Sequence, residues 1–144
     1  ADTGVLFIEG LADGIILQNH APGISVEVVR DLAYSILQAA RARFTKTEYI
    51  SCPGCGRTLY DLEGTIARIK AATAHLKGLK IAIMGCIVNG PGEMADADYG
   101  YVGAARGKVS LYKQKVCIEK NIPEEEAVER LLRFIEEDLS KNQE

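Results

Sequence analysis

Four side chains suited to binding a soft metal lie in two short segments of the chain. Cys52 and Cys55 belong to the segment 51–58 (Ser-Cys-Pro-Gly-Cys-Gly-Arg-Thr), and Cys86 and Glu93 belong to the segment 84–93 (Met-Gly-Cys-Ile-Val-Asn-Gly-Pro-Gly-Glu). Thiolates are the ligands that iron–sulfur clusters prefer, whereas a carboxylate is a harder ligand for iron. These residue types lead to the hypothesis that three cysteines, with Glu93 as an unusual fourth ligand, hold an iron–sulfur cluster.

The second segment contains residues that can turn the chain back on itself. Glycine tolerates positive φ and proline fixes its own φ, so Asn89-Gly90-Pro91-Gly92 can bring Glu93 toward Cys86. The alternative is an ordinary hairpin turn at Asn89-Gly90, with Glu93 as a solvated acid. The adjoining Cys86 and the upstream cysteine pair favour the ligand role. A carboxylate ligand is exchanged more easily than a thiolate, so an iron bound by Glu93 can release it and bind a substrate oxygen, much as a catalytic zinc site keeps one position open. Glu93 therefore predicts a catalytic cluster rather than one that only stores electrons.

The elements around the two segments predict that they meet in space. Strand composition over Thr45–Ser51 precedes the first segment, and the strand Leu79–Met84 runs straight into the second. Between them, Asp61 can cap an amphipathic helix that ends near Gly78. A strand, helix and strand of this length form a βαβ unit whose parallel strands end at the same edge of a sheet. We therefore expect both cysteine segments at that edge.

The remaining elements predict an α/β fold, a compact mixed sheet flanked by helices, forming a single domain over residues 1–144. Strands are expected at 4–9, 15–17, 98–102, 108–113 and 115–119. Ser25 can cap one long amphipathic helix, and Pro123 can open a final helix with an acidic first turn. The apolar stripe of that final helix consists of Val128, Leu131, Leu132, Ile135 and Leu139.

Composition excludes several classes of protein. A chain of 144 residues can bury about 70% of its unfolded surface, so its four cysteines are not needed as staples and fit metal or redox chemistry in a reducing compartment. A net charge of −3 without a basic run argues against nucleic acid or a membrane surface as a partner. Apolar runs are too short for a membrane span, and no signal-peptide pattern is present. Because the first residue is alanine, we expect the chain to be cut from a longer polypeptide.

A Cys-x-x-Cys pair alone does not identify its chemistry, because thiol oxidoreductases, zinc sites and clusters all use it. A thioredoxin-type pair opens a helix, whereas here Gly56 and further residues precede the expected cap at Asp61. Zinc sites usually have four cysteine or histidine ligands, and the chain has only His20 and His75. Cys117 lies in an expected strand, as a buried structural cysteine would. A zinc-stabilised structural module and a simple electron carrier remain open alternatives.

The two segments, read together as 51–58 and 82–93 (Ala-Ile-Met-Gly-Cys-Ile-Val-Asn-Gly-Pro-Gly-Glu), resemble the iron–sulfur domain of the 4-hydroxy-3-methylbut-2-enyl diphosphate synthase family, also called IspG or GcpE. The resemblance covers nearly the whole chain, is densest over residues 47–103, and points to the longer, three-domain type. It implies a fold like the cluster-binding modules of sulfite and nitrite reductases. It also implies a 4Fe-4S cluster bound by Cys52, Cys55, Cys86 and Glu93.

The resemblance further implies that Asn89 lines the substrate pocket. Arg57 matches a position of the family's motif without an assigned role, and Cys117 corresponds to no ligand of the family. The implied reaction is the reductive ring opening and dehydration of a cyclic diphosphate, 2-C-methyl-D-erythritol 2,4-cyclodiphosphate. The implied electron donor is ferredoxin or flavodoxin, in the bacterial cytoplasm or the plastid stroma. The family's substrate diphosphate is held by a TIM-barrel domain of the same or a neighbouring chain. No such barrel lies within these 144 residues, so the isolated domain is expected to be inactive.

Overall fold

The chain divides between Lys46 and Thr47 in the computed structural model, which describes residues 2–88 and 90–141. Contacts gather within Ala1–Lys46 and within Thr47–Glu144. That residues 1–144 form a single domain stays a prediction. The second unit contains all four of the predicted cluster ligands.

The first unit contains two helices, α1 (Asp2–Ile8) and α2 (Val26–Ala39). Ser25 caps α2 as predicted, because its side-chain oxygen accepts a hydrogen bond from the Val28 N–H. The strands predicted at 4–9 and 15–17 were wrong: the first segment is helical and the second has no regular structure. A short apolar run does not distinguish a strand from a helix, and a helix needs no partner strand to satisfy its backbone.

The second unit is built on a five-stranded sheet with strand order β1-β2-β3-β4-β5. The strands are β1 (Glu48–Ser51), β2 (Lys80–Met84), β3 (Tyr99–Ala105), β4 (Lys108–Lys113) and β5 (Val116–Pro123). The first three run parallel, and the last two are antiparallel to their neighbours. This mixed sheet confirms the predicted α/β class. Helix α3 (Leu62–Thr73) connects β1 to β2, and Asp61 caps it through a 3.1 Å hydrogen bond from the Gly64 N–H, so the predicted βαβ unit is also confirmed.

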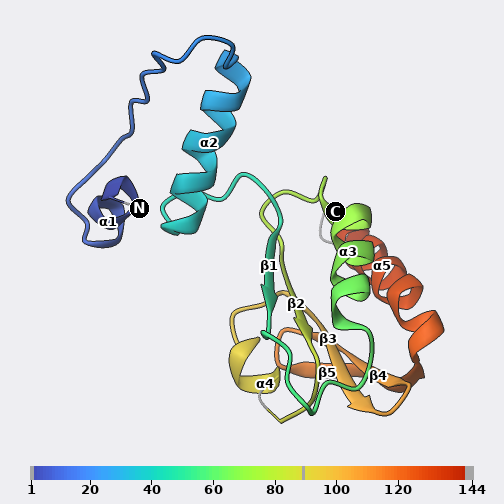
Figure 1. The fold of residues 1–144 in the computed structure, drawn as a ribbon. Helices are drawn as coiled ribbons and strands as arrows, with labels where there is room; N and C mark the ends of the chain where they lie inside the picture. Colours follow the sequence, from blue (N-terminus) through green and yellow to red (C-terminus); the bar gives the residue numbers. More distant parts are fainter. Residues whose placement is uncertain (1, 89, 142–144) are drawn as a thin grey trace. The chain divides into compact units, whose positions relative to one another are not determined.

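Helices cover the two faces of the sheet unequally (Figure 1). Helices α3 and α5 (Glu124–Lys141) lie side by side on one face, where Ile81 and Ile83 of β2 enter the main core. Ala82 and Met84 point to the opposite face and pack near the short helix α4 (Gly90–Glu93). Strand β2 is therefore buried on both faces, and its buried carboxyl end leads directly into Gly85 and Cys86. None of the helices in the described part of the chain has the length and apolar composition needed to cross a bilayer.

The stability of the second unit is expected to depend on the packing of α5. Leu131 lies on the predicted apolar stripe of this helix and is completely buried in the main core. Leu131→Ala should lower the free energy of unfolding by about 2–5 kcal/mol, because it removes apolar contacts and leaves a cavity. Urea denaturation measures the loss. The neighbouring Arg130→Ala removes only exposed ion pairs to Glu119 and Glu126 and should cost no more than about 1 kcal/mol; an equal loss in both variants would contradict the placement of the core.

Candidate metal centre

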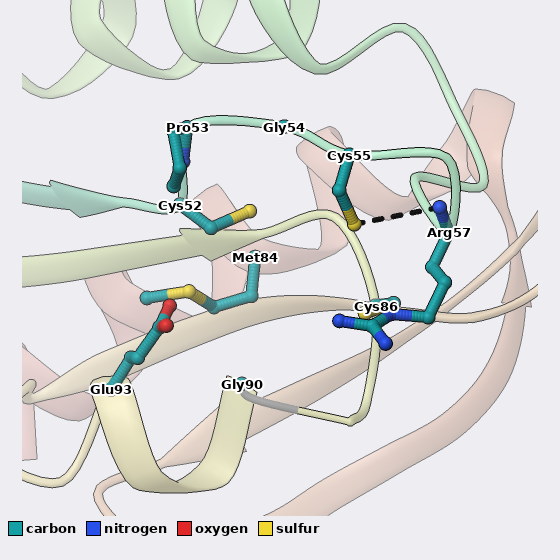
Figure 2. A pocket seen from close by; sticks show the side chains of 9 residues that line it. All are labelled: Cys52, Pro53, Gly54, Cys55, Arg57, Met84, Cys86, Gly90 and Glu93. Carbon is teal, nitrogen blue, oxygen red and sulfur yellow. Dashed lines mark hydrogen bonds between the residues drawn. The ribbon is translucent and has the colours of Figure 1, made fainter.

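A cavity of about 120 Å³ lies where the chain leaves β1 and β2. The residues that line it come from both cysteine segments and from α4: Cys52, Pro53, Gly54, Cys55, Arg57, Met84, Cys86, Gly90 and Glu93 (Figure 2). All four predicted ligands therefore lie around one space, and the three cysteines among them are free thiols. The parallel pairing of β1 with β2 places the two cysteine segments at the same edge, as the sequence predicted.

The first cysteine segment is held by short-range hydrogen bonds. The Cys55 N–H donates to Thr58 Oγ1 at 3.1 Å, and the Thr58 N–H donates to the Cys55 carbonyl at 2.9 Å. The Arg57 N–H donates to Cys55 Sγ at 3.4 Å. This bond, aided by the positive charge of the Arg57 guanidinium, lowers the pKa of the Cys55 thiol below its ordinary value. The thiolate, which is the metal-binding form, is thereby favoured at the exposed end of the cavity.

The second segment is joined to the first through the backbone at the end of β2. The Gly85 N–H donates to Cys52 Sγ at 3.2 Å, and the Gly85 carbonyl accepts a hydrogen bond from the Leu59 N–H at 3.2 Å. The Tyr60 hydroxyl donates to the Met84 carbonyl at 3.0 Å. Cys86 is buried, Cys52 is half-buried and Cys55 is exposed, so one side of the cavity is closed and the other faces solvent.

Glu93 reaches the cavity from the opposite side to the first cysteine segment. It is the last residue of α4, is exposed, and extends its carboxylate alongside Met84 (Figure 2). The segment 90–93 is one turn of helix rather than a hairpin. A Cβ at Gly90 would lie 3.0 Å from Val102 Cγ1, so α4 begins in tight contact with the sheet. Asn89, the other residue predicted to take part in catalysis, lies outside the described residues.

A single zinc ion and an iron–sulfur cluster require different arrangements of the sulfur and oxygen ligands. Across residues 2–88 and 90–141, no three His, Cys, Asp or Glu side chains gather closely enough to hold one metal ion. A zinc ion needs four ligands within about 2.0–2.3 Å of one point. A cluster offers a separate iron to each protein ligand, so its ligands stand farther apart. Three thiols and one carboxylate around a shared cavity are a donor set that could hold an iron–sulfur cluster.

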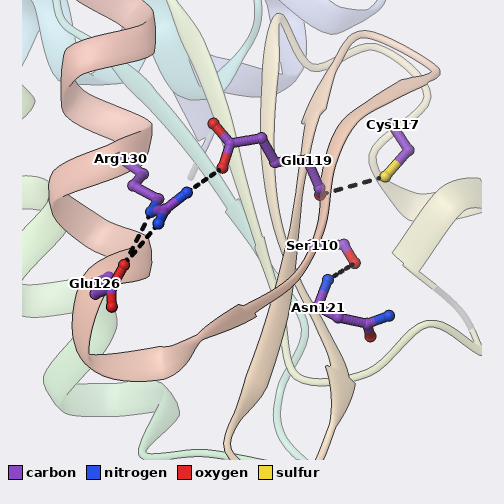
Figure 3. A network of polar contacts seen from close by, with 6 residues as sticks. All are labelled: Ser110, Cys117, Glu119, Asn121, Glu126 and Arg130. Carbon is purple, nitrogen blue, oxygen red and sulfur yellow. Dashed lines mark hydrogen bonds and ion pairs between the residues drawn. The ribbon is translucent and has the colours of Figure 1, made fainter.

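Cys117 lies apart from this cavity, on β5 (Figure 3). Its thiol donates to the Glu119 carbonyl at 3.4 Å, and the side chain is half-buried rather than buried as predicted. The Glu119 carboxylate forms an ion pair with Arg130, which also pairs with Glu126 on α5. The ion pair between Glu119 and Arg130 links β5 to α5. Cys117 is not among the residues that line the cavity.

Sequence reasoning assigned no role to several residues at or near the cavity. Met84 lines it with its side chain, and Thr58 and Tyr60 connect the two cysteine segments. Gly103 on β3 was also missed, although a Cβ there would lie 2.3 Å from the Gly85 carbonyl oxygen. A glycine inside a strand pattern often marks such a close approach of two backbones. That signal is present in Tyr-Val-Gly at 101–103, but it does not name the partner.

Comparison with known proteins gives consistent matches over this chain. The profile of the family described as "GcpE protein C-terminal domain" matches residues 48–137, more than half of the chain. Relatives named "4-hydroxy-3-methylbut-2-en-1-yl diphosphate synthase (flavodoxin)" are 75% identical over 137 residues in Bacteroides thetaiotaomicron, 62% over 132 in Chlorobaculum tepidum and 53% over 134 in Chlamydia caviae.

These matches cover 95%, 92% and 93% of the chain, but only 22%, 17% and 22% of the respective relatives. The chain thus corresponds to a small part of each longer protein. The matched region 48–137 lies within the second unit and includes the cavity with both cysteine segments. The chain belongs to the GcpE C-terminal domain family.

Proposed function

We propose that the cavity binds a 4Fe-4S cluster through Cys52, Cys55, Cys86 and Glu93. The observation that carries the proposal is that these four side chains, 41 positions apart from first to last, line one cavity at the ends of two parallel strands. The family membership and the names of the relatives support it. The group would supply single electrons and a Lewis-acidic iron when bound.

The chain is then the cluster-bearing part of an enzyme that makes 4-hydroxy-3-methylbut-2-enyl diphosphate from the cyclic diphosphate in isoprenoid biosynthesis. Three thiolates from the cysteine segments hold the cluster in place. Glu93 is the exchangeable ligand because it is the hard donor of the set and stands at an exposed position on a single turn of helix. Asn89 contacts the substrate, and Arg57 adds the positive charge among the residues that line the cavity.

The remaining parts of the reaction come from outside this chain. Flavodoxin, which the relatives' names print, or ferredoxin delivers two electrons one at a time. A TIM-barrel domain of the same or a neighbouring chain holds the substrate diphosphate, so the 144-residue chain binds a cluster without turning over substrate. A reducing compartment, the bacterial cytoplasm or the plastid stroma, keeps the thiols available.

Anaerobic reconstitution tests the proposal. The chain, supplied with ferrous iron, sulfide and a reductant, should take up about four iron and four sulfide per molecule and absorb broadly in the visible range. Iron, sulfide and zinc are measured on the purified product. Uptake of zinc without iron or sulfide would instead support a zinc-stabilised module and contradict the cluster.

A further inference from the structure

We infer that Thr58 and Gly85, here called the Thr58–Gly85 latch, hold the three cysteines in position before any metal binds. The inference rests on the proposed function, because it takes these cysteines to be metal ligands. Neither latch residue supplies a metal donor itself, so Thr58 is a positioning residue. Its contacts link the exposed Cys55 to Gly85, the residue that follows the buried end of β2.

Thr58 fixes the position of Cys55 through two reciprocal bonds. Its Oγ1 accepts the Cys55 N–H, and its own N–H donates to the Cys55 carbonyl. Cys55 is exposed, so little packing holds it otherwise. Gly54, with φ of +78°, brings the chain sharply into this turn. The position of the Cys55 thiol therefore depends on where the Thr58 side chain lies.

Gly85 fixes where Thr58 lies and also contacts the other two cysteines. A Cβ at Gly85 would stand 2.8 Å from Thr58 Oγ1 and 3.1 Å from its Cγ2, so only glycine allows this approach. The Gly85 N–H donates to Cys52 Sγ, and its carbonyl accepts the Leu59 N–H next to Thr58. Cys86 follows Gly85 directly in the chain. One pair of residues thus relates all three sulfur atoms to one another.

Gly85 is held in contact with Thr58 because β3 packs against the Gly85 backbone. Gly103 packs so closely that a Cβ on it would lie 2.3 Å from the Gly85 carbonyl oxygen and 3.2 Å from the Tyr60 ring. Tyr60 in turn donates its hydroxyl to the Met84 carbonyl, one residue before Gly85. The latch is therefore anchored in the sheet, and the thiol positions do not need to be created by the metal.

The latch predicts a loss of metal affinity without a matching loss of stability. Thr58→Val keeps the shape of the side chain but removes the acceptor for the Cys55 N–H, and should weaken Cd²⁺ binding to the 144-residue chain about 10- to 100-fold. It should also lower the iron content after anaerobic reconstitution. Thr58→Ser retains the hydroxyl and should restore both. Gly85→Ala, which displaces Thr58, should reproduce the loss.

Thr47→Val is the matched control, because the Thr47 hydroxyl donates to the Thr73 and Leu76 carbonyls away from the cavity. It should lower the thermal stability of the metal-free chain and leave Cd²⁺ affinity unchanged, the reverse of Thr58→Val. Equal Cd²⁺ affinity in wild type and Thr58→Val would overturn the inference, as would an equal loss in Thr47→Val. If the wild type binds Cd²⁺ but takes up no iron and sulfide, the cluster proposal fails while the Cd²⁺ comparison still decides the latch. If the wild type takes up iron and sulfide but does not bind Cd²⁺, the iron content of Thr58→Val after reconstitution decides the inference in place of Cd²⁺ affinity, and an iron content equal to that of the wild type would overturn it. A wild type that takes up neither Cd²⁺ nor iron and sulfide would overturn both the cluster proposal and the inference.

Discussion

Replacing Cys86 with alanine should reduce the iron content of the reconstituted chain from about four atoms per molecule to less than about one. Cys86 is the buried member of the three thiols and lies two residues beyond the end of β2, after Gly85. Its removal leaves two thiols and a carboxylate to hold the group. No other His, Cys, Asp or Glu among the described residues lines the cavity to replace it. Iron and sulfide analysis, with the visible spectrum, measures the loss.

Cys117→Ala is the matched control for this result. It removes the same thiol from a half-buried position on β5, outside the cavity. Its iron and sulfide content should equal that of the wild type. If Cys86→Ala retained a full complement of iron, or if Cys117→Ala lost it as well, the assignment of ligands would be wrong.

The sequence was most informative where local strand and helix signals agree with the topology that connects them. The run from Leu79 to Met84, the cap at Asp61 and the helix between them predicted a parallel pair of strands, and the structure has Ser51 beside Ile83 in that pair. Short crossover connections leave few ways to arrange such a unit. The meeting of the two cysteine segments at one sheet edge followed from this topology alone.

The sequence was least informative where structure depends on a partner that local pattern does not name. The apolar run over 4–9 has the composition of a strand, but no strand pairs with it in the described part of the chain, and it forms α1. Likewise, Thr58 and Gly85 are ordinary loop residues in sequence. Their contact depends on the position of Gly85 against Gly103 of β3, and the sequence pattern does not show that pairing. The candidate ligands could be proposed from residue chemistry, whereas Thr58 and Gly85, which contact the cysteine segments, could not.

Replacing Glu93 with cysteine should separate catalysis from electron storage. The variant presents four soft thiolates, so the reconstituted chain should bind its cluster at least as completely as the wild type. In a full-length protein that contains this segment, turnover should fall at least about 10- to 100-fold, because the exchangeable position is closed.

The loss in Glu93→Cys must be separated from a general effect of an added thiol near the cavity. Asp96 is an exposed acid just beyond α4, and Asp96→Cys makes the same chemical change outside the residues that line the cavity. It should leave both cluster content and turnover unchanged. A simple electron carrier has no use for an exchangeable ligand, so under that alternative Glu93→Cys would keep its function with a full cluster. Undiminished turnover in the fully loaded Glu93→Cys protein would therefore show that the carboxylate does not open the site to substrate, whereas a loss confined to Glu93→Cys would assign that role to it.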